Sequence, residues 1–117
     1  MSQSFEGKSV LTISSNARLF LYQAPMNMQK SFEGLSAATE QLFPGELLSG
    51  AFFIFLNRKR NYVKVLCFDG DGLVIWSKRL ERGKFLKKET NTSINRREFF
   101  MLLEGVTPKK LNPRFSL

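Results

Sequence analysis

The sequence predicts an α+β domain, in which an antiparallel β-meander sheet has one or two amphipathic helices packed on one face. Two observations indicate this class. Between residues 51 and 80, three apolar segments alternate with short turn-forming segments, which is typical of consecutive hairpins. Over 27–43 and 95–105, apolar residues instead recur every three or four positions, the spacing of one helix face.

The N-terminal part of the domain is expected to form a strand pair or one broken strand over 11–24. There, Leu19 and Leu21 alternate with Phe20 and Tyr22, so the two pairs should face opposite sides of a strand. At 117 residues the chain has the length of one domain. We expect a flexible N-terminus, a single α+β domain and a basic irregular tail, at 1–9, 10–106 and 107–117.

A first helix is predicted after Pro25. Asn27 is its expected N-cap, because a short polar side chain there can accept a hydrogen bond from the first turn. The apolar residues that follow are spaced by four, three, three and four positions and form one helical stripe: Met28, Phe32, Leu35, Ala38 and Leu42. Pro44 and Gly45 are expected to end the helix.

Three strands of the meander are predicted at 51–56, 62–68 and 73–80. The first is apolar throughout, which favours a central position, whereas the second alternates in polarity. The hairpin loop 57–61 is unusual because it holds three consecutive cations: Arg58, Lys59 and Arg60. The turn at 69–72 reads Asp-Gly-Asp-Gly, a composition that accepts the positive φ of tight hairpins.

A short strand over 90–93 and a last helix complete the predicted elements. Asn95 is the expected N-cap of this helix, and Glu98 stands three residues later, as in a capping box. Gly105 is placed to be the C-terminal cap. The apolar face of the helix has three members: Phe99, Leu102 and Leu103.

The positive charge of the chain lies in its second half. Residues 1–50 carry a net charge of −1, whereas residues 51–117 carry +9. In the meander, the end of the third strand returns to the loop 57–61, so two basic segments should merge and Tyr62 should lie near Arg79. Such a cluster suits phosphate contacts. Its candidate nucleic-acid-binding residues are Arg58, Lys59, Arg60, Lys78, Arg79, Arg82 and Lys84. The alternative is a solvated surface whose charge only prevents association.

The sequence shows no complete catalytic constellation. There is no histidine, the commonest general base, and the single cysteine, Cys67, lacks a disulfide partner and is expected to be buried. Asp69 and Asp71 resemble a metal-binding pair, but a hairpin turn explains them, so no metal or cofactor is expected. We therefore predict a non-enzymatic protein. The alternative, an independent nuclease, would need several converging carboxylates.

No segment of the sequence suggests a membrane or an export route. No apolar run approaches the roughly 20 residues of a membrane span. The first residues, MSQSFEGKSV, lack the apolar core of a signal peptide. A cytoplasmic location is therefore expected.

Four segments carry a family resemblance: 28–35 (MQKSFEGL), 50–60 (GAFFIFLNRKR), 64–83 (KVLCFDGDGLVIWSKRLERG) and 101–105 (MLLEG). Through them the chain resembles the TnpB-type accessory proteins, which are encoded by the second reading frame of the insertion sequence 66 family of bacterial transposable elements. The sequence departs from the family pattern at Gln29, where arginine is common. It departs again at Leu86-Lys87-Lys88, where the family often continues with an aromatic residue and a proline.

The resemblance implies a role in transposition beside a separate, larger transposase, without implying a defined chemistry. Two hypotheses follow. In the first, the protein is an accessory factor that contacts DNA through a basic end of the sheet. In the second, it is an interaction module that docks on the transposase or on another accessory subunit and has no DNA affinity of its own. DNA and an element-encoded protein are thus the expected partners.

Overall fold

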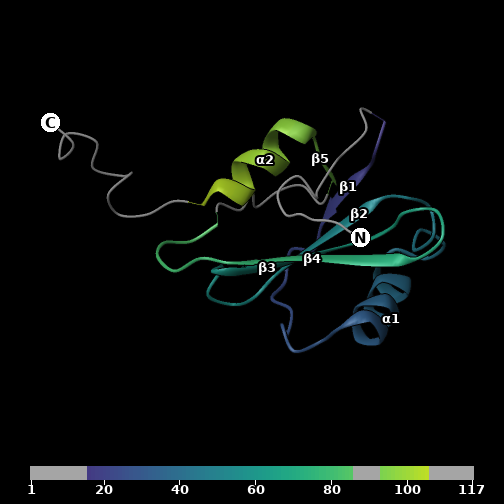
Figure 1. The fold of residues 1–117 in the computed structure, drawn as a ribbon, viewed down its shortest axis with the longest axis horizontal. Coiled ribbons are helices and arrows are strands. Elements are labelled where there is room, and N and C mark those ends of the chain that lie inside the picture. The colour runs from purple at the N-terminus through teal and green to yellow at the C-terminus, as the bar shows by residue number, and fades with distance from the viewer. Residues whose placement is uncertain (1–15, 86–92, 106–117) are drawn as a thin grey trace, which may run out of the picture.

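The computed structural model describes residues 16–85 and 93–105 of the chain. These residues form one five-stranded sheet with the strand order β4-β3-β2-β1-β5, together with two helices (Figure 1). The elements are β1 (Leu19–Leu21), α1 (Phe32–Leu42), β2 (Phe52–Leu56), β3 (Tyr62–Phe68), β4 (Leu73–Arg79), β5 (Ser93–Ile94) and α2 (Arg96–Glu104). The predicted loose N-terminus, the start of the predicted first strand, positions 90–92 and the basic tail lie outside the described residues.

The predicted α+β class and the antiparallel meander are confirmed. β2 pairs antiparallel with β3, and β3 pairs antiparallel with β4. The bounds of β3 match the prediction, whereas β2 begins one residue later and β4 ends one residue earlier than predicted. β1 lies parallel to β2, with Leu19 opposite Phe52, and α1 lies in the long connection that a parallel pair requires. The short β5 pairs antiparallel with β1.

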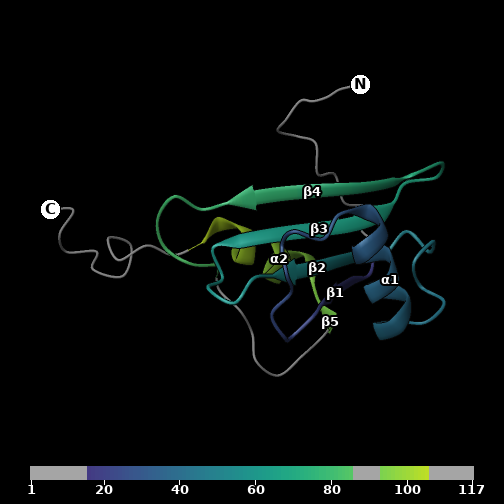
Figure 2. The same cartoon turned by 90° about the horizontal axis from the view of Figure 1, so that it is seen from below.

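The two helices cover opposite faces of the sheet, which corrects the prediction that the helices share one face (Figures 1 and 2). The reason lies in β2, whose five residues are all buried. Successive side chains of a strand point to opposite faces, so an apolar central strand needs cover on both sides. Leu35 of α1 packs with Phe53 and Phe55, whereas α2 packs over Phe52 and Ile54.

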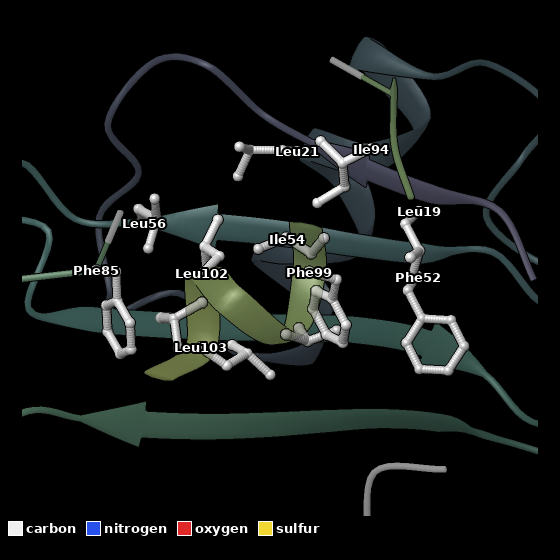
Figure 3. Packing of buried hydrophobic residues seen from close by; sticks show 12 residues of the cluster. Leu19, Leu21, Phe52, Ile54, Leu56, Phe85, Ile94, Phe99, Leu102 and Leu103 are labelled. Carbon is white, nitrogen blue, oxygen red and sulfur yellow. The ribbon is translucent and has the colours of Figure 1, made fainter. Parts of the chain in front are cut away.

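The core on the α2 side is the larger of the two apolar clusters (Figure 3). The ring centroids of Phe52 and Phe99 are 6.5 Å apart, and Leu102 and Leu103 complete the buried face of the helix. The predicted capping box is present, because the Asn95 side chain accepts a hydrogen bond from the Glu98 amide and the Glu98 side chain accepts one from the Asn95 amide. This end of α2 was therefore predictable from local chemistry alone.

The start of α1 differs from the prediction. The helix begins at Phe32, and the Asn27 side chain instead accepts a hydrogen bond of 2.8 Å from the Gln29 amide, which forms a local turn ahead of the helix. The apolar stripe is also only partly buried, because Phe32 is 47% and Leu42 is 37% exposed. The buried face is centred on Leu35 and on Thr39, whose hydroxyl donates to the Leu35 carbonyl at 2.7 Å.

Candidate nucleic-acid interface

The two basic segments meet at one end of the sheet, as the meander geometry requires. Arg79 lies opposite Tyr62 in the β3–β4 register. Beyond the strands, the Leu80 amide donates to the Asn61 carbonyl at 2.8 Å, and the Phe85 amide donates to the Arg60 carbonyl at 2.7 Å. The loops 57–61 and 80–85 therefore lie side by side (Figure 2). We call this region the basic end, with the members Arg58, Lys59, Arg60, Lys78, Arg79, Arg82 and Lys84.

The loop 57–61 is held by Asn57, which the sequence reading did not single out. Its side-chain oxygen accepts hydrogen bonds from the amides of Asn61 at 3.0 Å and Tyr62 at 3.1 Å. Its side-chain nitrogen donates to the Asn61 side-chain oxygen at 2.7 Å. The signal that could have found it is the pair of asparagines that flanks the three cations, since Asn commonly bonds nearby backbone in turns. The exposed Arg58 and Lys59 thus project from a fixed backbone.

Arg60 has a φ of 56° and is the one non-glycine residue in the described ranges with a positive φ. Its amide donates to the Asn57 carbonyl at 3.0 Å, so residues 57–60 form a turn whose last residue, Arg60, is the left-handed one. Glycine is the usual residue there, because a side chain in this region costs about 1–2 kcal/mol. An arginine is therefore present where the backbone alone would favour glycine.

Arg79 stacks on Tyr62, as the register predicts. The Arg79 guanidinium carbon lies 5.0 Å from the centroid of the Tyr62 ring, within the range of a cation–π contact. Tyr62 is half-buried and Arg79 is exposed. The aromatic ring thus orients the guanidinium while its hydrogen-bond donors stay accessible.

Lys78 lies on the other face of the sheet, and its ammonium already has a structural partner. Lys78 Nζ donates to the Leu103 carbonyl at 3.1 Å, at the C-terminal end of α2. The last carbonyls of a helix lack intrahelical donors and carry partial negative charge, so this contact stabilises α2. Lys78 is half-buried. Of the seven predicted residues, it is the one whose side chain bonds a helix carbonyl in the described part of the chain.

Arg82 and Lys84 are exposed on the loop that follows β4. The loop is fixed beneath them by Phe85, whose side chain is fully buried in the α2-side core. Within residues 16–85 and 93–105, none of the seven cations forms an ion pair, whereas Arg18, at another site, pairs with Glu46. That pairing lowers the pKa of the Glu46 carboxyl through the Arg18 hydrogen bond. Apart from Lys78, the members of the basic end therefore have neither a carboxylate partner nor a helix carbonyl as partner among the described residues.

The acidic turn lies at the opposite end of the strands. Asp69 and Asp71 are exposed, and the Asp69 amide donates to the Gly72 carbonyl at 3.0 Å in a tight turn with Gly70 at a φ of 101°. β3 separates this turn from the basic end by about 20 Å at the usual rise per residue. In the described ranges, no three acidic, cysteine or histidine side chains are grouped as a metal site.

Cys67 faces the α2 side near the acidic turn and is half-buried, whereas the sequence predicts a buried thiol. Burial raises the pKa of its thiol to about 11, and the nearby Asp69 charge acts in the same direction. The thiol is therefore protonated at neutral pH. A protonated thiol is a poor nucleophile.

The family model described as "IS66 Orf2 like protein" matches residues 17–113. The chain belongs to this family. Membership indicates an accessory protein of transposition, which works with the machinery of a mobile element. All described strands and both helices fall within the matched range.

Two curated relatives come from Sinorhizobium fredii (strain NBRC 101917 / NGR234), and both are called uncharacterized. Protein y4hO is 29% identical over 77 residues, which cover 66% of this chain and 67% of the relative. Protein y4jC is 24% identical over 96 residues, which cover 80% of this chain and 82% of the relative. No solved structure matches the chain. In the described part, neither helix is long and apolar enough to cross a membrane.

Proposed function

We propose that this IS66 Orf2-like protein is a non-catalytic accessory factor that contacts DNA phosphates through its basic end and acts in the cytoplasm. The observation that carries the proposal is the convergence of six exposed or partly exposed cations from two loops and a strand end, without an ion-pair partner among the described residues. Lys78 is set apart because it bonds the Leu103 carbonyl.

The arrangement supports binding in a defined orientation. Arg58, Arg60 and Lys59 stand on a hydrogen-bonded hairpin, so little loop entropy would be lost on binding. Arginine can also contact two phosphate oxygens at once. The acidic turn at the far end would be repelled by the same polyanion, which favours approach by the basic end.

The proposal is tested by binding to duplex DNA over a range of salt concentrations. Phosphate contacts predict that log K falls linearly with log salt, with a slope of about −0.9 per contact. The variant Arg58→Ala/Lys59→Ala should weaken binding to all sequences alike and reduce the slope by about 2. A charge-matched control, Arg96→Ala/Arg97→Ala, removes two exposed cations from the first turn of α2 and should leave the slope nearly unchanged.

Binding that is absent at low ionic strength, or that does not respond to salt, would overturn DNA contact. The non-catalytic part is tested separately with divalent metals. Metal-dependent cleavage that disappears in Asp69→Asn or Asp71→Asn would show a nuclease instead.

A second candidate function is docking on an acidic surface of the transposase or another accessory subunit. Phe100 and Met101 favour it, because they are 43% and 47% exposed on α2, whose C-terminal end contacts Lys78 of the basic end. Large exposed apolar side chains beside cations can anchor a protein partner. Co-purification with the transposase from nuclease-treated extract, combined with no affinity for DNA alone, would select this function over the first.

A further inference from the structure

The basic end contains a groove of about 620 Å³ on the α1 side of the sheet. Its volume lies within the roughly 300–1,000 Å³ that is usual for small-molecule sites. One wall is the segment 25–28 that precedes α1, and the other is the loop 57–61 with the end of β4. The lining residues that matter here are Met26, Met28, Arg58, Lys59, Tyr62 and Arg79.

Tyr62 and Arg79 provide a flat surface in this groove. The Arg79 guanidinium carbon lies over the Tyr62 ring, 5.0 Å from its centroid, and Arg79 has no carboxylate partner among the described residues. A guanidinium held in this way can stack on a nucleobase with its outer face, and it can donate to a neighbouring phosphate from its edge.

The facing wall is apolar and fixed in place. The Met26 amide donates to the Leu56 carbonyl at 2.8 Å, and both Met26 and Met28 pack against the α1-side core. Lys64 Nζ donates to the Lys30 carbonyl at 2.7 Å, which ties the chain two residues after this segment to β3. The polarisable thioethers of methionine make favourable contacts with aromatic faces.

The rim of the groove carries Arg58 and Lys59, both exposed. The groove thus combines cations at its edge with a stacking plane and an apolar wall inside. The bases of a duplex are stacked on one another, so duplex DNA can offer such a groove phosphates and base edges, but not the face of a base. An unpaired nucleotide can offer a base to the interior and a phosphate to the rim.

We propose that this groove binds an unpaired nucleotide of single-stranded DNA. The inference rests on the proposed function, because Arg58, Lys59 and Arg79 belong to the same basic end. It adds that the basic end prefers single-stranded DNA to a duplex of equal length. It also assigns the preference to stacking in the groove and not to charge.

The test compares one mixed-sequence single strand with its own duplex by fluorescence anisotropy at fixed salt. The variant Arg79→Lys keeps the charge and removes the planar guanidinium. We expect it to weaken single-strand binding about fivefold to tenfold and duplex binding less than about twofold. The matched control Arg97→Lys makes the same exchange at an exposed position of α2, outside the groove lining and the basic end, and should change neither affinity by more than about twofold.

A second probe does not depend on any variant. An abasic strand of the same length keeps every phosphate and offers no base. The wild-type protein should bind it about as weakly as Arg79→Lys binds the intact strand.

The outcomes separate the two proposals. Equal binding of single strand, abasic strand and duplex, with no selective effect of Arg79→Lys, would overturn the groove inference and leave phosphate contact intact. Failure to bind any of the three probes at low salt would overturn the proposed DNA contact itself.

Discussion

The Phe85 amide donates a hydrogen bond of 2.7 Å to the Arg60 carbonyl and thereby joins the two basic segments of the chain. Phe85 is buried in the α2-side core, and Arg60 belongs to the loop between β2 and β3. A core residue thus fixes the position of one cation-bearing loop against the other. The relative placement of the cations is a property of the folded sheet and not of either loop alone.

Replacing Arg60 with glycine should raise stability and weaken DNA binding. Glycine adopts a φ of 56° without the steric cost that arginine incurs, which raises the stability of the folded state. Glycine also increases the conformational entropy of the unfolded chain, which offsets part of this gain. We expect a net gain of about 0.5–1 kcal/mol in the free energy of unfolding, measured by urea denaturation. Duplex affinity should fall as for the loss of one phosphate contact.

The matched control for this exchange is Arg58→Gly, since Arg58 stands in the same loop without a positive φ. It should lower the free energy of unfolding, because glycine adds freedom only to the unfolded chain. A loss of stability in both variants would contradict the assignment of backbone strain to Arg60.

Replacing Lys78 with methionine should destabilise the fold. The variant keeps most of the aliphatic stem and removes the hydrogen bond from Lys78 Nζ to the Leu103 carbonyl. We expect a loss of about 1 kcal/mol, measured by urea denaturation. The exposed Lys84 offers the control, since Lys84→Met should change stability by less than about 0.5 kcal/mol. Equal effects would mean that Lys78 does not stabilise the end of α2.

The Cys67 thiol should ionise at unusually high pH. Burial raises its pKa to about 11 from the usual 9.0, so the folded state favours the protonated thiol. The unfolded chain releases this proton first as pH rises. The contribution of Cys67 to stability is therefore present below pH 9 and declines between about pH 9 and 11.

Alkylation by iodoacetamide checks this prediction, because the thiolate is the reactive form. The rate for the native protein should stay low at pH 8 to 9 and rise towards pH 11. The urea-unfolded protein is the control and should react readily near pH 9. A native rate that already levels off by pH 9 would contradict the raised pKa.

Several elements could be predicted because their signals are local. The Asp-Gly-Asp-Gly turn and the alternation of 62–68 define β3 without reference to the rest of the chain. Asn95 and Glu98 define the start of α2 in the same way. The meeting of the basic segments followed from strand order, since an antiparallel return leaves only one end of the sheet for both.

Other features depend on contacts between distant segments. The apolar sequence of β2 indicates burial on both faces, but it does not say which helix covers which face. The parallel pairing of β1 with β2 and the contact from Lys78 to Leu103 likewise join segments far apart in the chain. At Asn27, two local structures competed for one side chain, and the turn to Gln29 formed instead of the helix cap.

Replacing Phe85 with a smaller residue should increase local opening of the basic end while the protein stays folded. Phe85→Leu removes part of a fully buried ring and should cost about 1–2 kcal/mol, while the backbone amide remains. Since that amide joins loop 80–85 to Arg60, its hydrogen exchange should speed up more than exchange within β3. Duplex affinity should fall although every cation is retained, because the two basic segments would lose their fixed spacing.

Phe100→Leu, at a ring that is 43% exposed, is the control and should leave exchange and affinity unchanged. If Phe85→Leu lowered stability and left DNA affinity at the wild-type value, the fixed spacing of the two segments would not matter for binding.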